Sequence, residues 1–311
     1  MTNDTIGVDI SKDHLDAHRI SDGESRRFTN DNAGHGSFMA WLGGLGGRIV
    51  YEPTGPYHRT FERRLAEAGL ALVKVNPRQA RRFAEATGKL AKTDRMDAAM
   101  LARMGALLDL EARAVRSPRL GDLKDLHTAR EALVKNRTAA KNRAKTISLA
   151  ILRRHNAEQL RQIERQIAAI ETEIMALIKA DPELARRFDI LVSIPGVAIV
   201  TAFALIIDMP ELGTLSNGQA ASLAGLAPVA RQSGQWTGRA FIRGGRASVR
   251  QALYMPALVA MRFNPGLKEK YDHFIAAGKP AKKAITAIMR KLIVLANALL
   301  RDDRKWTPNL P

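Results

Sequence analysis

Four carboxylates in the first hundred residues have the types and spacing of a metal site. Asp9 interrupts an apolar run, where burying a carboxylate is costly unless it is paired or binds a cation. Glu52 follows a second apolar run and precedes a proline-glycine turn, which leaves it at the end of a strand. Asp94 and Asp97 share one face at the start of a predicted helix, where the helix dipole favours negative charge. Each acid alone also fits a structural role, such as capping of that helix by Thr93 and Asp94.

Taken together, the four acids predict divalent-cation chemistry on phosphodiesters. Carboxylate oxygens are the hard ligands that Mg²⁺ prefers, and a pair of such ions stabilises both the attacking and the leaving oxygen of a phosphodiester displacement. We therefore expect Asp9, Glu52, Asp94 and Asp97 to be catalytic and to hold Mg²⁺, with Mn²⁺ as a substitute.

A serine in the second half of the chain lies among arginines and is a candidate nucleophile. Ser233 stands in Gln-Ser-Gly, which is followed by a stretch rich in glycine and arginine, residues 239–246. Attack by its hydroxyl on a phosphodiester needs charge cancellation on the phosphorane, which metal ions and arginines supply. The candidate arginines, which we also expect to contact nucleic acid, are Arg231, Arg239, Arg243 and Arg246.

Other side chains compete for the same roles. Ser248 is the rival nucleophile, but its position at the start of a predicted helix favours capping. Tyr57 and Tyr254 would support a tyrosine mechanism, which we favour less. His58 follows a turn, where a histidine is more often a surface residue than a base. Trp236 either stacks on a base or anchors its loop.

The first 110 residues alternate strand and helix patterns that must position the acids. Short apolar or alternating runs predict five strands, and helical periodicity predicts the segments between them. The expected strands are residues 6–10, 15–20, 26–29, 48–52 and 71–75, and the expected helices are residues 36–42, 58–68, one beginning at Pro77, and 94–108. This order, with acids on the first strand, the fourth strand and a late helix, resembles the α/β ribonuclease-H-like (RuvC-like) nuclease fold.

Residues 120–179 are helical throughout and predict a long arm or a helical hairpin. The stretch has no proline and a single glycine. Apolar side chains repeat in it at intervals of four and three residues, as in a coiled coil, but over too few heptads to exclude an ordinary intramolecular helix pair. These seam residues are Ile163, Ile167, Ile170, Ile174 and Leu177.

Part of this arm is basic without any acid. Residues 135–154 contain lysines and arginines but neither aspartate nor glutamate, whereas solvated helix faces usually mix both signs. The stretch therefore predicts a surface that faces phosphates. The residues that we expect to contact nucleic acid here are Lys135, Arg137, Lys141, Arg143 and Lys145.

Beyond Asp181 the composition shifts to small and apolar residues punctuated by glycine and proline, which predicts a mainly α domain. Residues 191–197, followed by an apolar helix, are typical of a helix-hairpin-helix-like turn whose backbone amides receive a DNA phosphate, although a plain helix connection explains them equally well. We expect three domains: a catalytic domain of residues 1–118, a helical arm of residues 119–180 and a C-terminal domain of residues 181–311.

Composition limits the partners and the cofactors. The chain of 311 residues has 49 Lys and Arg against 31 Asp and Glu, and its formal charge of +18 predicts a polyanionic partner, with nucleic acid as the default. The absence of cysteine excludes disulfides, cysteine-bound zinc and thiol catalysis. Neither a secretory signal nor a long apolar run is present, so we expect a cytoplasmic protein without a membrane partner.

Six motifs in order make the chain resemble the DEDD transposases of bacterial insertion sequences, the "IS one-ten" family. The resemblance spans nearly the whole chain, and the order of the motifs is far more specific than any one of them. The N-terminal motifs are Gly7-Val8-Asp9-Ile10-Ser11-Lys12, Glu52-Pro53-Thr54-Gly55 and Lys92-Thr93-Asp94-Arg95-Met96-Asp97-Ala98. The C-terminal motifs are Ile194-Pro195-Gly196, Gly225-Leu226-Ala227-Pro228 and Gln232-Ser233-Gly234.

The resemblance implies more than the residues themselves show. It implies that the four acids hold Mg²⁺ and that Ser233 attacks DNA to form a transient phosphoserine link. It also implies a homo-oligomer, dimer or tetramer, in which one subunit's acidic domain completes a site with another's serine domain. A structured non-coding bridge RNA would then pair with both donor and target DNA.

Two other functions stay open at this point. The first is a RuvC-like nuclease or junction resolvase that uses water as the nucleophile, with Ser233 only binding phosphate. The second is a nucleic-acid-binding protein without enzymatic activity, whose acids are structural. A protein–DNA adduct at Ser233 would separate the recombinase from the nuclease, and a metal titration would separate both from the binding protein.

Overall fold

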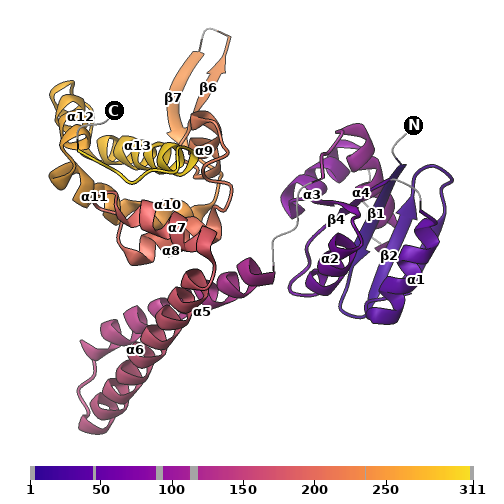
Figure 1. Ribbon diagram of the computed structural model, residues 1–311, viewed down its shortest axis with the longest axis horizontal. Helices are drawn as coiled ribbons and strands as arrows, with labels where there is room; N and C mark the ends of the chain where they lie inside the picture. The colour runs from indigo at the N-terminus through magenta and orange to yellow at the C-terminus, as the bar shows by residue number, and fades with distance from the viewer. Residues whose placement is uncertain (1–3, 45–46, 89–93, 113–117, 235, 309–311) are drawn as a thin grey trace. The chain divides into compact units, whose positions relative to one another are not determined.

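The computed structural model describes residues 4–44, 47–88, 94–112, 118–234 and 236–308, and it forms two compact units (Figure 1). The first unit is residues 1–118 and the second is residues 119–311. The arm and the C-terminal domain that the sequence predicts both belong to the second unit. Among the described residues, none of the helices combines the length and the apolar content of a membrane span.

The first unit is a mixed α/β structure built on a five-stranded sheet. In the sheet order β3-β2-β1-β4-β5, the first three strands form an antiparallel meander, while β4 and β5 run parallel to β1. The elements are β1 (Asp4–Ile10), β2 (His14–Arg19), β3 (Ser25–Thr29), α1 (Asn32–Leu42), β4 (Gly47–Tyr51), α2 (His58–Glu67), β5 (Ala71–Lys74), α3 (Pro77–Ala86) and α4 (Asp94–Leu107).

Caps explain where two of these helices begin. Helix α1 begins at Asn32 and not at residue 36, because the Asp31 side chain accepts a hydrogen bond from the amide of Gly34 and satisfies the first turn. Helix α3 begins at Pro77, where a missing N–H costs nothing, and Asn76 caps it in the same way.

Apolar side chains cover both faces of the sheet. On one face, Phe38 of α1 and Phe61 of α2 pack against buried residues of β1 and β4, with the two ring centroids 5.4 Å apart. On the other face, Val50 and Val73 pack with α3 and with Leu101 of α4. The sheet is therefore a rigid middle layer, as a site assembled from several strands requires.

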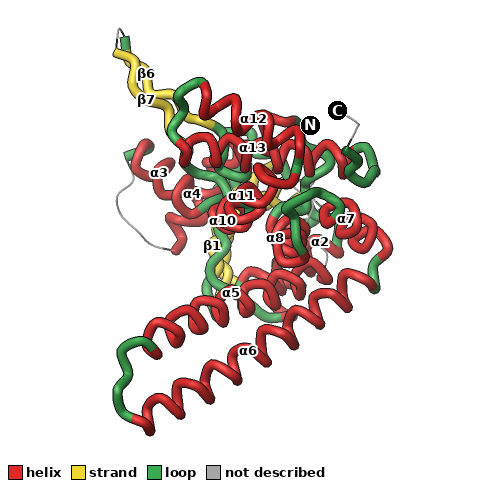
Figure 2. The backbone as a smooth tube through the Cα atoms, turned by 90° about the vertical axis from the view of Figure 1, so that its left-hand side faces the viewer, coloured by secondary structure: helices red, strands yellow, loops and turns green. Residues whose placement is uncertain are grey.

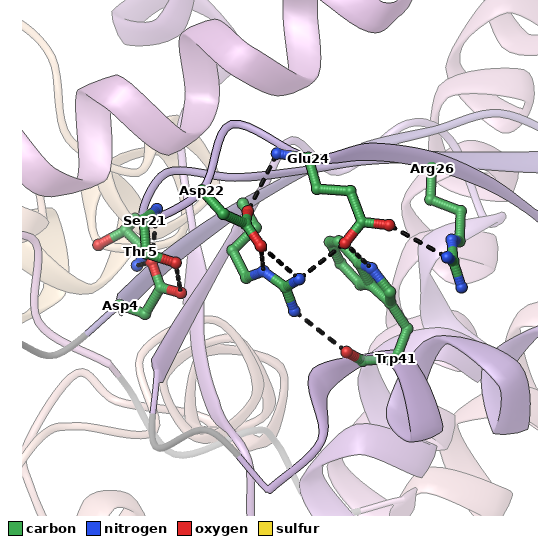
Figure 3. A network of polar contacts seen from close by, with 8 residues as sticks. Asp4, Thr5, Ser21, Asp22, Glu24, Arg26 and Trp41 are labelled. Atoms are coloured by element: carbon green, nitrogen blue, oxygen red, sulfur yellow. Dashed lines mark hydrogen bonds and ion pairs between the residues drawn. The ribbon is translucent and has the colours of Figure 1, made fainter.

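A buried arginine, Arg19, ends β2 opposite Ile6 of β1 and interacts with polar residues that Figure 3 labels around it. The Arg19 guanidinium contacts the carboxylates of Asp22 at 2.6 Å and Glu24 at 2.7 Å, and it lies over the Trp41 ring with 4.6 Å to the centroid. The hydrogen bond from Arg19 lowers the pKa of Asp22 to about 2. This network joins the β2–β3 turn to helix α1.

The second unit is mainly helical, as the sequence predicts. It contains a long helical pair, a compact helical body and one β-hairpin. The elements are α5 (Pro118–Ala144), α6 (Ala150–Lys179), α7 (Pro182–Val192), α8 (Ile199–Asp208), α9 (Asn217–Leu223), β6 (Pro228–Ser233), β7 (Trp236–Ile242), α10 (Ala247–Ala252), α11 (Tyr254–Phe263), α12 (Pro265–Ala276) and α13 (Ala281–Arg301).

Helices α5 and α6 lie side by side and antiparallel (Figure 2). Arg130 of α5 pairs with Glu171 of α6 at 2.7 Å, and the Asn156 amide donates to the carbonyl of Ala140 at 3.2 Å. The apolar seam of α6 is buried within the chain. Of the two alternatives, a coiled coil or an intramolecular helix pair, the structure has the helix pair. The fully buried members of the seam are Ile163, Ile167 and Ile174, while Ile170 and Leu177 are partly buried.

The helical body surrounds α8, which is buried along most of its length and packs against α7 and α10. Helix α13 belongs to the same core and packs against α7, α9, α11 and α12. The predicted helix-hairpin-helix-like turn joins α7 to α8. Gly196 in this turn has a φ of +98°, and a Cβ there would lie 2.6 Å from the carbonyl of Pro256 in α11. Glycine is therefore required here both by its backbone conformation and by the close approach of α11.

A β-hairpin formed by β6 and β7, not expected from the sequence, extends from the body (Figure 1). Strands β6 and β7 pair only with each other, and every residue of β6 is exposed. Because neither face of β6 is buried, the sequence lacks the alternation of apolar and polar residues by which strands are recognised. The expected glycine- and arginine-rich loop is in part this hairpin.

Candidate active site

Asp9 and Glu52 stand next to each other on adjacent parallel strands. The register of β1 and β4 pairs Val8 with Tyr51, Asp9 follows Val8 within β1, and Glu52 directly follows the last residue of β4. Both acids therefore lie at the carboxyl edge of the parallel part of the sheet, and both are half-buried. The sequence predicted two acids from two strands at one edge, and the structure places them there.

The two side chains also lie on the same face of the sheet. A Cβ at Gly7 would overlap the carbonyl of Ala98, so Gly7 faces α4. Val50 lies in the core that α3 and α4 form with the sheet. Side chains two residues apart on a strand point to the same face. Asp9 therefore faces α4, and the same alternation, extended one residue beyond β4, puts Glu52 on that face.

Helix α4 brings a third acid to this edge. A Cβ at Gly105, late in α4, would lie 2.9 Å from the methyl group of Thr5, early in β1. The earlier helix residue Ala98 lies against the later strand residue Gly7, so helix and strand run antiparallel. Two strand residues advance about 6.6 Å and one helical turn about 5.4 Å, so the turn preceding Ala98 is level with Asp9. Asp97 belongs to this turn and is half-buried.

The three acids share an edge without forming a ligand cluster. Within the described part of the chain, no three acidic or histidine side chains lie close enough to hold a metal ion. Asp9, Glu52 and Asp97 each interact with other groups. Asp94 is the first residue of α4, but its side chain and all of Thr93 fall outside the described residues. The donor types nevertheless fit a hard divalent cation, since half-buried carboxylates on rigid elements are its usual ligands.

An asparagine ties together the two loops that follow Asp9 and Glu52. The Asn30 amide donates to the carbonyl of Ser11 at 2.8 Å and to the carbonyl of Tyr57 at 3.2 Å. Its oxygen lies 2.8 Å from the Nε2 atom of His35, which is fully buried. The role of Asn30 is not apparent from the sequence, because an asparagine beside a helix start is most simply interpreted as a turn residue.

A polar cluster supports the segment after Glu52 from the opposite face. The Lys74 ammonium lies 2.7 Å from the Glu62 carboxylate, and the Nε2 atom of His58 lies 3.5 Å from it. Burial lowers the pKa of His58 and, together with Glu62, raises that of the fully buried Tyr51. The prediction that His58 is a surface residue was wrong, since its side chain is only 12% exposed. The i,i+4 spacing of His58 and Glu62 was the available signal.

Ser233 is the last residue of β6, at the end of the hairpin. It pairs across the hairpin with Trp236, and Gly234 in the turn has a φ of +55°. The serine is exposed. Two residues earlier, the Arg231 guanidinium lies over the Phe241 ring, 5.6 Å from its centroid. The hairpin thus presents the candidate nucleophile to solvent on the strand that also carries Arg231.

The other candidate arginines differ in their surroundings. Arg246 forms two hydrogen bonds of 2.7 Å with the Glu211 carboxylate and one of 2.8 Å with the carbonyl of Asp208, and the bond to Glu211 raises its pKa. Its guanidinium therefore braces the base of the hairpin loop. Arg243 is exposed, and the side chain of Arg239 falls outside the described residues.

Ser248 does not cap a helix, contrary to the prediction. Helix α10 begins at Ala247, and the Ser248 hydroxyl bonds to the buried carboxylate of Asp208. Burial acts to raise the pKa of Asp208, but hydrogen bonds from Lys124 and Ser248 outweigh it and lower that pKa. The rival nucleophile is thus part of an internal network that joins α5, α8 and α10.

The basic side chains of the arm are largely exposed. Lys135, Lys141, Arg143 and Lys145 are exposed, and Arg137 is half-buried. Lys141 lies 3.5 Å from Glu164, and Arg143 donates to Gln159. Helix α6 thus supplies an acid that the sequence of α5 alone does not show, while the outer side of α5 stays basic.

Two family models of transposases match the chain, one from the start of the first unit into the arm and one within the second unit. The model of the DEDD transposases of IS110, described as "Transposase", matches residues 6–152. A second model, "Transposase IS116/IS110/IS902 family", matches residues 188–272. Together they cover most of the chain, which belongs to the IS110 family of transposases.

Individual relatives agree with this assignment. The pilin gene-inverting protein of Moraxella bovis is 29% identical over 321 aligned positions, which cover 98% of both chains, and that of Moraxella lacunata is equally similar. An uncharacterized 43.6 kDa protein of the insertion element IS110 from Streptomyces coelicolor is 32% identical over half of this chain and 38% of its own length. The chain is accordingly a DNA transposase or recombinase, and its family suggests a divalent metal cofactor.

Proposed function

We propose that the chain is a Mg²⁺-dependent recombinase that cleaves and exchanges DNA strands through a covalent link to Ser233. The observation that carries the proposal is the register of β1, β4 and α4, which brings Asp9, Glu52 and Asp97 to one face of one sheet edge. The strand order β3-β2-β1-β4-β5, with helices between the later strands, supports a ribonuclease-H-like fold for the first unit.

The acids would hold the metal, and other residues of the first unit would position them. Asp9, Glu52, Asp94 and Asp97 are the proposed ligands of Mg²⁺ or Mn²⁺. The bound cation would polarise the phosphodiester and offset the charge that develops on its oxygens. Asn30 would keep the segments after the first two acids in place, because it bonds to both of them.

The serine step exchanges one ester for another. A bond forms between the Ser233 oxygen and phosphorus as the phosphodiester's bond to a deoxyribose oxygen breaks. The serine proton passes to a base, and the released oxygen takes up a proton. The hydroxyl of a second strand then reverses the step and frees the serine, so no external energy source is needed. Arg231, Arg239 and Arg243 are the proposed cations for the phosphorane.

The nucleic-acid partners follow from charge and family. The exposed lysines and arginines of α5 are proposed to contact phosphates of DNA or of a structured non-coding bridge RNA, which would select donor and target by base pairing. We further propose a homo-oligomer, dimer or tetramer, in which the acids of one subunit meet Ser233 of another. The separation of the acids and the serine into two units supports this arrangement.

Strand exchange between donor and target DNA, with the element's own RNA and Mg²⁺, tests the proposal. Wild type, Ser233→Ala and Asp9→Ala are compared, with Ser37→Ala as the control because Ser37 is exposed on α1. Ser37→Ala should be active, Asp9→Ala inactive, and only chains that keep Ser233 should form a protein–DNA adduct.

Normal exchange by Ser233→Ala would remove the serine from its role. Cleavage without any adduct in the wild type would favour the nuclease that uses water. If Asp9→Ala bound Mn²⁺ as well as the wild type does, the acidic site itself would be refuted.

A further inference from the structure

A large aromatic ring lies exposed beside the candidate nucleophile. Trp236 is the first residue of β7 and pairs directly with Ser233 across the hairpin. Its side chain is 60% exposed, although tryptophan buries more apolar surface than any other residue when it is covered. The proposed function uses the serine and leaves this ring without a role.

The indole ring of Trp236 lies against the backbone of a glycine, Gly238. A Cβ at Gly238 would lie 2.7 Å from Cζ3 and 3.0 Å from Cζ2 of the Trp236 indole, so the benzene part of the ring covers the bare backbone of β7. Any other residue at position 238 would push the ring away. The ring therefore rests on the hairpin and still exposes most of its surface, while base stacking by Trp236 stays a prediction.

One face of the hairpin groups the ring with a hydroxyl and a cation. Directly opposite residues of an antiparallel pair share a face, and so do residues two apart on one strand. Trp236 lies opposite Ser233, and Gly238 lies opposite Arg231, so all four residues share this face. Residues 228–246 contain four arginines and no acid, so the surface suits a polyanion.

We propose that Trp236 is a stacking platform for the DNA base next to the phosphate that Ser233 attacks. The identity of that phosphate rests on the proposed function. Aromatic side chains bind unpaired bases through their ring faces, and this contact tolerates every base. Trp236 is thus a positioning residue that fixes a single-stranded or unstacked nucleotide without reading its sequence.

The test observes the ring directly in the full chain. Protein labelled with 5-fluorotryptophan gives three ¹⁹F signals, for Trp41, Trp236 and Trp306, and Trp236→Phe assigns the one of interest. A Ser233→Ala background prevents covalent capture, so the outcome does not depend on the serine being the nucleophile. On titration with a single-stranded deoxyadenosine 12-mer, about one binding-site length, the Trp236 signal should shift while the other two stay. An unchanged Trp236 signal at saturation overturns the proposal.

Affinities in the same background separate stacking from charge. Trp236→Ala should weaken binding by about 5-fold to about 150-fold, and Gly238→Ala, which keeps the indole but displaces it, should also weaken binding. Neither should change the slope of log K against log salt, whereas Arg231→Gln should reduce its magnitude by about 0.7. Phe263→Ala is the control, since Phe263 is an exposed ring on α11.

Three results contradict the proposal. Equal affinity of Trp236→Ala and the Phe263→Ala control would show that the ring does not bind the strand. Tighter binding of an adenosine RNA 12-mer than of the DNA, with the same Trp236 shift, would assign the platform to RNA. A change of salt slope in Trp236→Ala would show that the substitution rearranges the arginines and that stacking is not what was lost.

Discussion

Replacing Gly7 by alanine should separate helix α4 from the acids on the sheet. Gly7 is the point of closest approach between β1 and α4, where an added Cβ would overlap the carbonyl of Ala98 and come within 3.0 Å of the Ala102 Cβ. A backbone cannot yield as a flexible side chain does, so the helix must move outward by about 1 Å. Asp97 would move with it, because it is the residue that precedes Ala98.

The size of the effect follows from that displacement. Overpacking of this kind costs about 1–3 kcal/mol in the free energy of unfolding, which leaves a folded chain at 25 °C. A misplacement of about 1 Å in a catalytic group costs about 100-fold in rate. We therefore expect Gly7→Ala to be folded by circular dichroism, to bind Mn²⁺ more weakly and to exchange strands about 100-fold more slowly than the wild type.

The control is another glycine of the same unit. Gly36 lies in α1 with open space around its Cα, so Gly36→Ala adds a methyl group without a clash and should leave metal affinity and exchange unchanged. The two variants are assayed side by side for Mn²⁺ affinity by electron paramagnetic resonance and for strand exchange. If Gly7→Ala matched Gly36→Ala in both while Asp9→Asn was inactive, the inferred register of α4 against β1 would be wrong.

Two further predictions concern the second unit. Burial lowers the pKa of His127, so the unfolded chain binds more protons than the folded one near pH 6.5, and the free energy of unfolding should fall as the pH drops through this value. Urea unfolding between pH 7.5 and 5 should show a smaller loss of unfolding free energy for His127→Gln than for the wild type. An equal loss in both chains would show that His127 does not cause the pH dependence. Arg246→Lys cannot keep both hydrogen bonds to Glu211 and should lose about 1 kcal/mol, with faster amide exchange at residues 223–246 than in the wild type. If amide hydrogen exchange at residues 223–246 were unchanged, the Arg246–Glu211 pair would not stabilise the base of the hairpin.

Local patterns were sufficient to locate the acids but not to orient them. Asp9 and Glu52 stand out because each adjoins an apolar run, and the strand pattern then places both at one sheet edge. The position of Asp97 depends on α4 packing closely on β1. That packing relies on Gly7 and Gly105, whose missing side chains are visible in the sequence but whose partners are not. A helix register against a sheet is a tertiary property, so no periodicity within α4 reveals it.

The prediction that Arg246 contacts nucleic acid was made because its pairing partner is distant in the sequence. In the sequence it is the last of several arginines in a glycine-rich stretch, which predicts a phosphate contact. Its partner Glu211 lies 35 residues earlier, on the far side of α9 and the hairpin. The same limit applies to the arm, where the acid beside Lys141 comes from the neighbouring helix. Counting the lysines and arginines of one helix overestimates the unpaired positive charge when the helix packed beside it supplies acids.

The position of the serine explains why catalysis would require the meeting of two units. Ser233 stands on a hairpin that has no acid between residues 228 and 246, so nothing in that segment can accept its proton or hold a cation. The acids at the sheet edge, in turn, belong to a unit that ends before the arm begins. A serine exposed beside arginines is unreactive by itself, because cations stabilise the phosphorane but do not deprotonate the hydroxyl. Separating the two halves of the chemistry would keep the chain from cutting DNA until the nucleic acid brings them together.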